Sequence, residues 1–174
     1  VLFRSTVVTL QAGAFTPTIP IAGTPPVIEL AHAQAGVIRL DGYEAAPTGD
    51  VDLAKAQVIV CAGRGIGKAD HLDMIADLAS ALKGEYAASR PVVDAGWVDP
   101  SRQVGTTGQT VAPKLYIACG VSGAIQHLTG MKKSEFVIAI NTDKDAPIGE
   151  VADVLAVADA KQLVPLLTQQ ITAS

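Results

Sequence analysis

Residues 115–130 constrain the fold more than any other stretch, because they combine an apolar run, glycines and a short helical segment. Leu115–Cys119 has the composition and length of a buried strand. Gly120 allows a turn that a side chain would resist, Ser122 is a suitable helix N-cap, and Gly130 is placed to end a helix. We therefore predict a strand, a glycine turn and a short helix whose N-terminus can bind an anion.

The predicted helix also brings a histidine close to this anion site. Gly123 and His127 are four residues apart and would share one helix face. A phosphate held at Ser122 and Gly123 would then have the imidazole one turn further along. Alone, the pattern suits either a phosphate or nucleotide site or a strand–turn–helix unit that binds nothing.

Composition narrows the class of protein. The chain has 174 residues, enough for one domain or slightly more, and is 49% hydrophobic but only 4% aromatic. A core of Ala, Val, Ile and Leu is typical of parallel sheets covered by helices. The net charge of -4, without a basic run, argues against nucleic-acid binding, and no apolar stretch reaches membrane-spanning length. We interpret Cys61 and Cys119 as reduced core residues, in preference to a metal or redox role.

Residues 1–50 differ from the rest of the chain in composition and in hydrophobic pattern. Short strand candidates alternate there with loops rich in proline and glycine, and helical periodicity is lacking. The chain begins without Met inside what reads as a strand, so we expect a fragment. We predict that residues 1–50 are a β-rich remnant of an earlier domain, with a boundary at Ala45–Asp50, and that residues 51–174 form the main domain.

Apolar strands alternate with helical segments beyond this boundary. The predicted strands are 57–61, 85–88, 115–119, 136–140 and 154–158. Asp70 is the predicted N-cap of the first helix and Lys83–Gly84 its end, while Pro165 fits the first turn of the last helix. This alternation predicts an α/β fold with a Rossmann-like parallel sheet and helices on both faces.

Polar residues follow the carboxyl ends of the predicted strands, which form one rim in such a sheet. They are Arg64, Ser89, Arg90, Ser122–His127, Asn141 and Asp159. Arginines and helix N–H groups suit phosphate, and an acidic residue suits ribose hydroxyls. The rim therefore predicts a long anionic ligand that carries a hydroxylated sugar.

Five blocks of this sequence closely resemble a known family. They are Gly63–Gly65, Ala88–Trp97, Gln103–Gly108, Ala112–Met131 and Ile140–Ile148. The family is the FAD-binding domain of the electron transfer flavoprotein alpha subunit, and the resemblance covers about residues 50 to 174. Because that subunit has a further domain before this one, residues 1–50 look like the tail of it.

The resemblance implies FAD as the cofactor and a role for each matching position. Arg64 would approach the FAD phosphates, and Ser89 and Arg90 would sit at the isoalloxazine ring. Val104, Gly105, Thr106 and Thr107 would line the flavin, with Thr107 near N5. The pyrophosphate would be held by Ser122, Gly123, Ala124, Ile125, Gln126 and His127, with His127 near the C2 carbonyl. The adenosine end would be held by Asn141, Asp159 and Ala160.

Two positions depart from the family pattern. Thr106 stands where Gln is usual, which puts any long side-chain contact from that position in doubt. Thr142 stands where Lys is usual, which removes a cation beside the ribose.

The resemblance further implies an electron carrier without substrate turnover of its own. In the family, a heterodimer with the beta subunit passes single electrons from dehydrogenases, such as the acyl-CoA dehydrogenases of fatty acid β-oxidation, to a membrane-bound quinone oxidoreductase. We expect a bacterial cytoplasmic protein, with the mitochondrial matrix as the other option. A cation about 4 Å from the reduced ring would contribute roughly 4 kcal/mol at an effective dielectric constant near 20, before desolvation. We identify no catalytic or metal-ligating residue.

Other interpretations stay open at this point. A module of the same architecture could bind NAD or another adenine nucleotide without redox chemistry, and Arg90, Thr107 and His127 distinguish the two, since only a flavin ring needs them. Asp94 is a general base or, preferably, a partner of Arg90. Asp159 is a ribose ligand or a helix cap.

Overall fold

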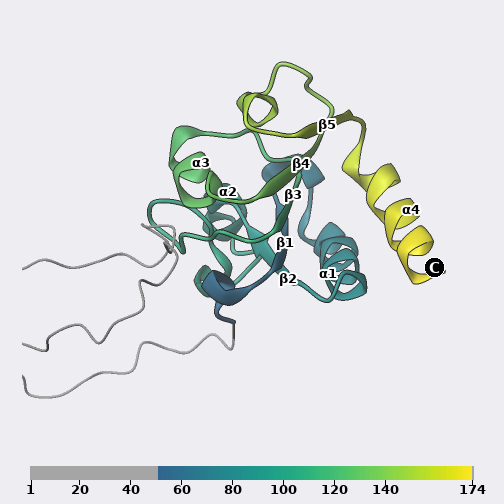
Figure 1. The fold of residues 1–174 in the computed structure, drawn as a ribbon, viewed down its shortest axis with the longest axis horizontal. Coiled ribbons are helices and arrows are strands. Elements are labelled where there is room, and N and C mark those ends of the chain that lie inside the picture. The colour runs from purple at the N-terminus through teal and green to yellow at the C-terminus, as the bar shows by residue number, and fades with distance from the viewer. Residues whose placement is uncertain (1–50, 174) are drawn as a thin grey trace, which may run out of the picture.

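The structure is a computed structural model that describes residues 51–173 (Figure 1). The predicted strands and domain remnant of residues 1–50 therefore lie outside the described residues, and the domain boundary stays a prediction. The described part contains a five-stranded parallel sheet in the order β2-β1-β3-β4-β5. Its strands are β1 (Val58–Ala62), β2 (Glu85–Ala88), β3 (Leu115–Cys119), β4 (Phe136–Asn141) and β5 (Val154–Val157). The predicted α/β parallel sheet is confirmed.

The register aligns the carboxyl ends of the strands. Ala62 at the end of β1 pairs with Ala88 of β2 and with Cys119 of β3. Asn141 at the end of β4 pairs with Val157 of β5. The residues that follow the strands therefore lie along one edge of the sheet, at the carboxyl ends of the strands, as the sequence predicted.

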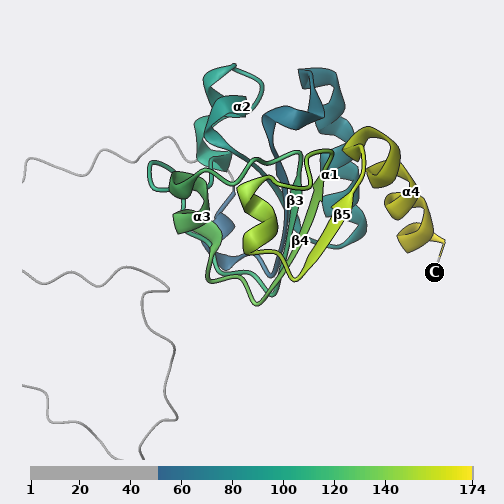
Figure 2. The ribbon, with the colours of Figure 1, turned by 90° about the horizontal axis from the view of Figure 1, so that it is seen from above.

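Helices cover both faces of the sheet (Figures 1 and 2). On one face, α1 (Leu72–Ala81) and α4 (Ala160–Thr172) pack against each other and against a cluster that includes Val60, Ile117 and Ile140. On the other face lies α3 (Ile125–Met131), whose Met131 joins a second cluster with Ile59 and Tyr116. Alternate strand residues enter the two clusters because successive side chains of a strand point to opposite faces. The remaining helical segments of the described residues are short: α2 (Arg90–Asp94) and 3₁₀ turns at 53–55, 64–66, 69–71, 100–102 and 147–150.

The start of α1 differs from the prediction. A 3₁₀ turn, Ala69–His71, precedes the helix, so His71 and not Asp70 occupies the N-cap. The Asp70 carboxylate instead pairs with Lys68 Nζ at 2.8 Å. The predicted end is close to the observed one: Lys83 takes a left-handed conformation with φ 55°, and Gly84 N donates to Ala79 O.

The predicted helix after β3 also needs correction. It begins at Ile125 with Ala124 as N-cap, so Ser122 is not the cap, and Gly123 lies outside the helix and shares no helix face with His127. Gly130 lies inside this helix, which ends at Met131. A Cβ on Gly130 would come within 2.5 Å of the Gly105 backbone, so close contact between two segments explains this glycine better than helix termination.

The last helix starts earlier than predicted. Asp159 is the N-cap of α4, and Pro165 lies within the helix and not in its first turn. Its missing N–H removes one helical hydrogen bond. The prediction placed the start too late because it read proline as a first-turn residue.

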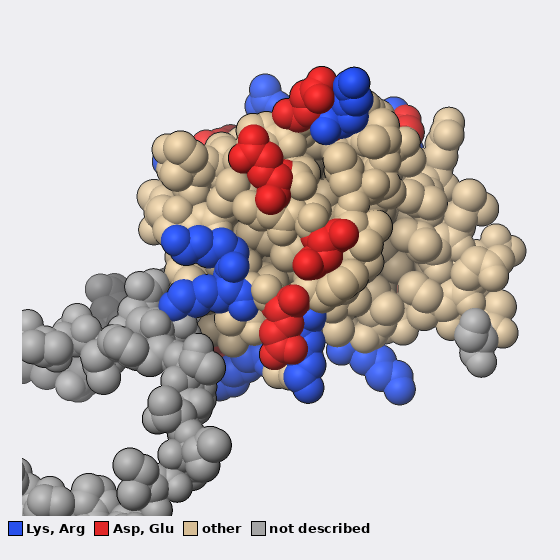
Figure 3. Space-filling model, turned by 45° about the horizontal axis from the view of Figure 1, so that its top comes forward, with Lys and Arg blue, Asp and Glu red and all other residues tan. Residues whose placement is uncertain are grey.

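The surface and the cysteines agree with the compositional argument. Cys61 and Cys119 are buried and free, as predicted. In Figure 3, acidic side chains lie along the middle of the face and most basic ones at its left and lower edges, with largely uncharged surface between them. Within residues 51–173, helices are all too short or too polar to cross a membrane.

Candidate functional site

A cleft of about 490 Å³ opens at the carboxyl ends of the strands. It lies where the strand order reverses, since β1 continues to β2 on one side while β3 lies on its other side. Ligands of open α/β sheets bind at such switch points. The residues that line it are Arg64, Gly65, Ser89–Pro91, Asp94, Gln103–Thr107, Gly120–Ala124, Gln126, His127, Asn141, Asp143 and Ala146.

Most of the predicted site residues meet in this cleft. They are Arg64, Ser89, Arg90, Val104, Gly105, Thr106, Thr107, Ser122, Gly123, Ala124, Gln126, His127 and Asn141. The other three lie elsewhere: Ile125 is 78% exposed at the start of α3, and Asp159 and Ala160 begin α4. The structure adds eight residues to the lining: Gly65, Pro91, Asp94, Gln103, Gly120, Val121, Asp143 and Ala146. All eight lie within the sequence blocks that carry the family resemblance, so that resemblance could have included them.

Glycines form one half of the cleft by direct backbone contact. Gly63 N donates to Cys119 O at 2.8 Å, and Gly65 N donates to Gly120 O at 2.9 Å. A Cβ on Gly63 would overlap the Gly120 carbonyl, and one on Gly65 would lie 2.8 Å from Gly120 Cα. Gly120 itself has φ +63°, which favours glycine. The loops after β1 and β3 are therefore joined without room for side chains between them.

Two arginines supply positive charge to the cleft. Arg64 belongs to the 3₁₀ turn after β1, and Arg90 opens α2 after β2. Arg90 Nε contacts Asp94 Oδ2 at 3.3 Å, and both side chains are more than 60% exposed. Such an exposed pair is weak, so Arg90 can turn to an anionic ligand. This contact supports the preferred interpretation of Asp94 as a partner of Arg90.

The 103–109 loop forms the opposite half of the cleft. Val104 N donates to Ala88 O at 3.0 Å, and Thr106 N donates to Gln126 O at 2.9 Å. The buried Gln103 donates from Nε2 to Thr107 Oγ1 at 2.9 Å. Because Thr107 accepts this bond, its own hydroxyl proton is left for another acceptor.

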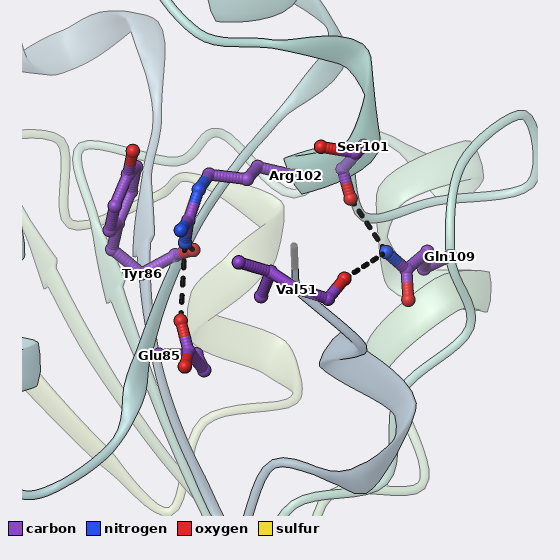
Figure 4. A network of polar contacts seen from close by, with 6 residues as sticks. All are labelled: Val51, Glu85, Tyr86, Ser101, Arg102 and Gln109. Carbon is purple, nitrogen blue, oxygen red and sulfur yellow. Dashed lines mark hydrogen bonds and ion pairs between the residues drawn. The ribbon is translucent and has the colours of Figure 1, made fainter. Parts of the chain in front are cut away.

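A polar network anchors this loop (Figure 4). Arg102 Nη1 donates to Tyr86 O at 2.8 Å and pairs with Glu85 at 3.2 Å, while its guanidinium stacks 3.6 Å from the Tyr86 ring centroid. Gln109 Nε2 donates to Ser101 O at 2.6 Å and to Val51 O at 3.4 Å. Planar stacking together with two hydrogen bonds uses features that arginine has and lysine lacks. The loop is thus tied to the edge strand β2.

His127 lies in the cleft wall and is 6% exposed. Its Nε2 is 2.9 Å from Tyr116 Oη and 3.9 Å from Cys61 Sγ. Burial lowers the pKa of His127 to about 4, against an opposing effect of the Val104 backbone, so the imidazole is neutral at pH 7. Burial also raises the pKa of Cys61 to about 12 and the pKa of Tyr116 well above its usual range. All three groups are therefore uncharged.

Asn141 and Asp159, which were predicted to hold the adenosine end, form hydrogen bonds with nearby residues of the chain. Asn141 Nδ2 donates to Val121 O at 2.9 Å, and its Oδ1 accepts from Asp143 N at 3.1 Å. Asp159 Oδ1 accepts from Lys161 N at 2.9 Å, and Oδ2 pairs with Lys161 Nζ at 3.2 Å. The backbone hydrogen bond from Lys161 is the main cause of the lowered pKa of Asp159. Asp159 is thus observed as a helix cap.

The arrangement can hold a phosphate-containing ligand with a polar ring. Two guanidinium groups can bind phosphate, the Thr107 hydroxyl can donate, and the buried Nδ1 of His127 has no hydrogen-bond partner. Buried polar atoms are almost always paired. An unpaired polar atom in the wall of a cleft is therefore consistent with a site for a polar ligand.

Comparison with known proteins gives the family. Residues 52–132 match the family model described as the electron transfer flavoprotein FAD-binding domain. The electron transfer flavoprotein subunit alpha of Clostridium acetobutylicum is 50% identical over 123 residues, which cover 71% of this chain and 37% of that protein. That of Thermoanaerobacterium thermosaccharolyticum is 52% identical over 121 residues, covering 70% and 37%.

A eukaryotic relative matches over the same share of its length. The probable electron transfer flavoprotein subunit alpha, mitochondrial, of Caenorhabditis elegans is 52% identical over 127 residues, covering 73% of this chain and 38% of that protein. This chain thus spans less than two fifths of the length of each of these three relatives. The predicted resemblance is confirmed, and FAD is the cofactor of the matched family. Residues 52–132 of this chain thus match the family of the electron transfer flavoprotein FAD-binding domain.

Proposed function

We propose that this chain binds FAD in the cleft and carries single electrons as part of an electron transfer flavoprotein alpha subunit. One observation carries the proposal: Arg64, Arg90 and His127, from three separate segments, line one cleft together with Thr107. In this view residues 51–174 are the FAD-binding domain, and residues 1–50 are the tail of the domain before it.

Each residue has a role that follows from its surroundings. The guanidinium of Arg64 binds the pyrophosphate, and that of Arg90 faces the isoalloxazine ring. The Thr107 hydroxyl donates a hydrogen bond to the ring, since Gln103 already occupies its oxygen. His127 donates a hydrogen bond as a neutral group, because burial keeps its pKa near 4. When bound, FAD supplies the one-electron chemistry, and these residues bind it and adjust its energetics.

The charge that favours reduction therefore comes from arginine. A neutral imidazole near the ring contributes a dipole and not a unit charge, whereas a guanidinium stays protonated at any physiological pH. Arg90 is mostly exposed, so solvent screens it until a ligand covers the cleft. We infer that Arg90 has the larger effect on the reduction potential, and His127 the larger effect on orientation.

We assign the adenosine end to Asn141, Asp159 and Ala160, with Ile125 at the mouth of the cleft. Asn141 pairs with Val157 across β4 and β5, so Asp159 follows the next strand along the same rim. This assignment requires the ligand to extend beyond the cleft-lining residues.

We also propose the partners of the whole protein. The relatives are named as alpha subunits, which supports a heterodimer with a beta subunit. Dehydrogenases such as acyl-CoA dehydrogenases would donate electrons, and a membrane-bound quinone oxidoreductase would accept them. We propose a bacterial cytoplasmic setting, and the mitochondrial name of one relative keeps the matrix as the other option.

The test is ligand binding by the full chain, with and without a beta subunit. Flavin absorbance of the purified protein and fluorescence titrations with FAD, FMN and NAD measure it. We expect FAD to bind, and to bind more tightly with the beta subunit present. Binding of NAD without FAD would replace the proposal by the adenine-nucleotide alternative.

Arg90→Ala sharpens this test. It should weaken FAD binding by about tenfold, the scale of a hydrogen bond to a charged group, and lower the reduction potential of the bound flavin. Lys114→Ala removes an exposed cation outside the cleft and is the matched control. An unchanged potential in an Arg90→Ala protein that still holds FAD would remove the assigned role.

A further inference from the structure

Three side chains form a buried polar cluster behind the cleft, within an otherwise apolar core. They are Cys61 of β1, Tyr116 of β3 and His127 of α3, from elements that are distant in sequence. Cys61 and Tyr116 are fully buried, and neither lines the cleft. Only His127 reaches both the cluster and the cleft wall. The cluster is thus in a position to control this one cleft residue.

The hydrogen bond between Tyr116 and His127 limits where the imidazole proton can be. The hydroxyl of Tyr116 stays protonated, because burial raises its pKa well above the usual range. If it donates to Nε2, across the observed 2.9 Å, the single proton of the neutral ring must be on Nδ1. The ring then presents a donor on the side opposite Tyr116.

The other tautomer is less favourable. With its proton on Nε2, the ring would donate to Tyr116 Oη, and the Tyr116 hydroxyl would need a different acceptor. The Cys61 sulfur lies 3.9 Å from Nε2, and a thiol is a weak acceptor. The Tyr116 proton would then lose the ring nitrogen as its acceptor and have only the weakly accepting sulfur in its place. Tyr116 therefore favours the proton on Nδ1.

We propose that Tyr116 is a positioning residue that holds His127 as its Nδ1–H tautomer, so that Nδ1 donates to a carbonyl-type acceptor of the ligand in the cleft. Among the buried side-chain atoms of the described structure, Nδ1 makes no hydrogen bond of standard geometry, and the Val104 backbone is the group that otherwise acts on this ring. A buried donor without an acceptor is unfavourable, and a ligand that supplies one removes this penalty. The inference rests on the proposed function for the ligand's identity, but the tautomer itself does not.

The first test is the tautomer in the FAD-free full chain. Two-bond ¹H–¹⁵N correlation spectra of ¹⁵N-histidine protein distinguish the protonated ring nitrogen from the bare one. We expect the His127 proton on Nδ1. A proton on Nε2 would overturn the inference, whether or not the chain binds FAD. Failure of FAD to bind would instead count against the proposed function, with the tautomer still measured.

The second test uses Tyr116→Phe, with Tyr86→Phe as the matched control. Tyr86 lies on β2, and its ring stacks on Arg102, a contact that Phe keeps. Tyr116→Phe should mix the two tautomers of His127, weaken FAD by about tenfold and shift its reduction potential, whereas Tyr86→Phe should leave all three unchanged. A Tyr116→Phe protein with the wild-type tautomer and affinity would overturn the role.

A third variant separates the sulfur from the hydroxyl. Cys61→Ala removes the weak partner at 3.9 Å and leaves the Tyr116–His127 bond. We expect the proton to stay on Nδ1 and the FAD affinity to change less than twofold. A loss equal to that of Tyr116→Phe would show that general repacking of the cluster, and not the tyrosine proton, sets the affinity. If Tyr116→Phe fails to fold, the wild-type tautomer spectrum still decides the inference.

Discussion

The two halves of the cleft are held by different forces. On one side, the loops after β1 and β3 touch backbone to backbone at Gly63, Gly65 and Gly120. On the other side, side chains hold the wall through the Gln103–Thr107 and Tyr116–His127 hydrogen bonds. The glycine half tolerates no added atom, whereas the hydrogen-bonding side chains of the other half can be replaced at the expense of a hydrogen bond. The glycine half therefore fixes the shape of the cleft, and the other half supplies its hydrogen-bonding groups.

This division explains where functional variation can occur. A change in the glycine half alters the path of the backbone at the switch point and affects folding before it affects a ligand. A change to one of the hydrogen-bonding side chains of the other half removes a donor or acceptor and leaves the fold in place. The substitution at Thr106, where the family has glutamine, falls in the second half. Its effect should therefore be on the ligand.

The largest expected effect is that of Gly63→Ala. Gly63 has φ -98°, which alanine also adopts, so the penalty is steric alone: the new Cβ would overlap the Gly120 carbonyl. With backbone on both sides of the contact, neither loop can yield without breaking strand-end hydrogen bonds. We expect the free energy of unfolding to fall by at least about 4 kcal/mol, measured by urea denaturation.

Gly96→Ala is the matched control for this prediction. Gly96 has φ +71° and nothing within 4 Å of its added Cβ, so it isolates backbone conformation from steric overlap. We expect a loss of only about 1 kcal/mol. Equal losses for Gly63→Ala and Gly96→Ala would mean that the glycine half owes its rigidity to conformation and not to contact.

Sequence reasoning was most successful where one residue type has one purpose. β2 and β3 were predicted with their observed bounds because short apolar runs between turns have few other interpretations. Gly120 was predicted to allow a turn after the strand, and its φ of +63° is the conformation that favours glycine. The cleft wall could be anticipated because residues after parallel strands share a rim.

Sequence reasoning failed where one residue type has several uses. Ser122 resembled a helix cap, but α3 begins three residues later. Gly130 resembled a helix end, but its purpose is contact with Gly105, which only the tertiary structure reveals. The Tyr116–His127 bond was missed for the same reason, since an apolar strand gives no sign that its tyrosine meets a histidine on α3.

The next effect in size is a pH dependence that arises in the side-chain half. Burial lowers the pKa of His127 from 6.5 to about 4. Between these values the unfolded chain binds a proton that the folded chain does not, so folding becomes less favourable as pH falls. We expect His127 to reduce the free energy of unfolding by about 3 kcal/mol from pH 7.5 to pH 4. Urea denaturation at several pH values measures this slope.

His127→Gln provides the comparison, because glutamine is polar but does not titrate. The lowered carboxylate pKa values in the described structure, those of Asp52, Asp70, Asp99 and Asp159, act mainly below pH 4 and are common to both proteins. The variant should therefore have a flatter profile between pH 4 and 6.5. The same slope in both proteins would show that His127 titrates normally and is accessible to water.

The smallest expected effect is that of Asp159→Ala, which tests how far the site extends past the cleft. Asp159 caps α4 through a single bond from Lys161 N at 2.9 Å, so its loss should lower Tm by only a few degrees. Asp99→Ala is the matched control, because Asp99 accepts an equivalent 2.9 Å bond from Ser101 N and does not line the cleft. If Asp159 also binds the ribose, its variant should weaken FAD by about tenfold and leave FMN, which lacks the adenosine half, unchanged. Fluorescence titrations of both flavins with both variants measure this. Equal losses for FAD and FMN, or equal losses in Asp159→Ala and Asp99→Ala, would limit Asp159 to capping and confine the site to the cleft-lining residues.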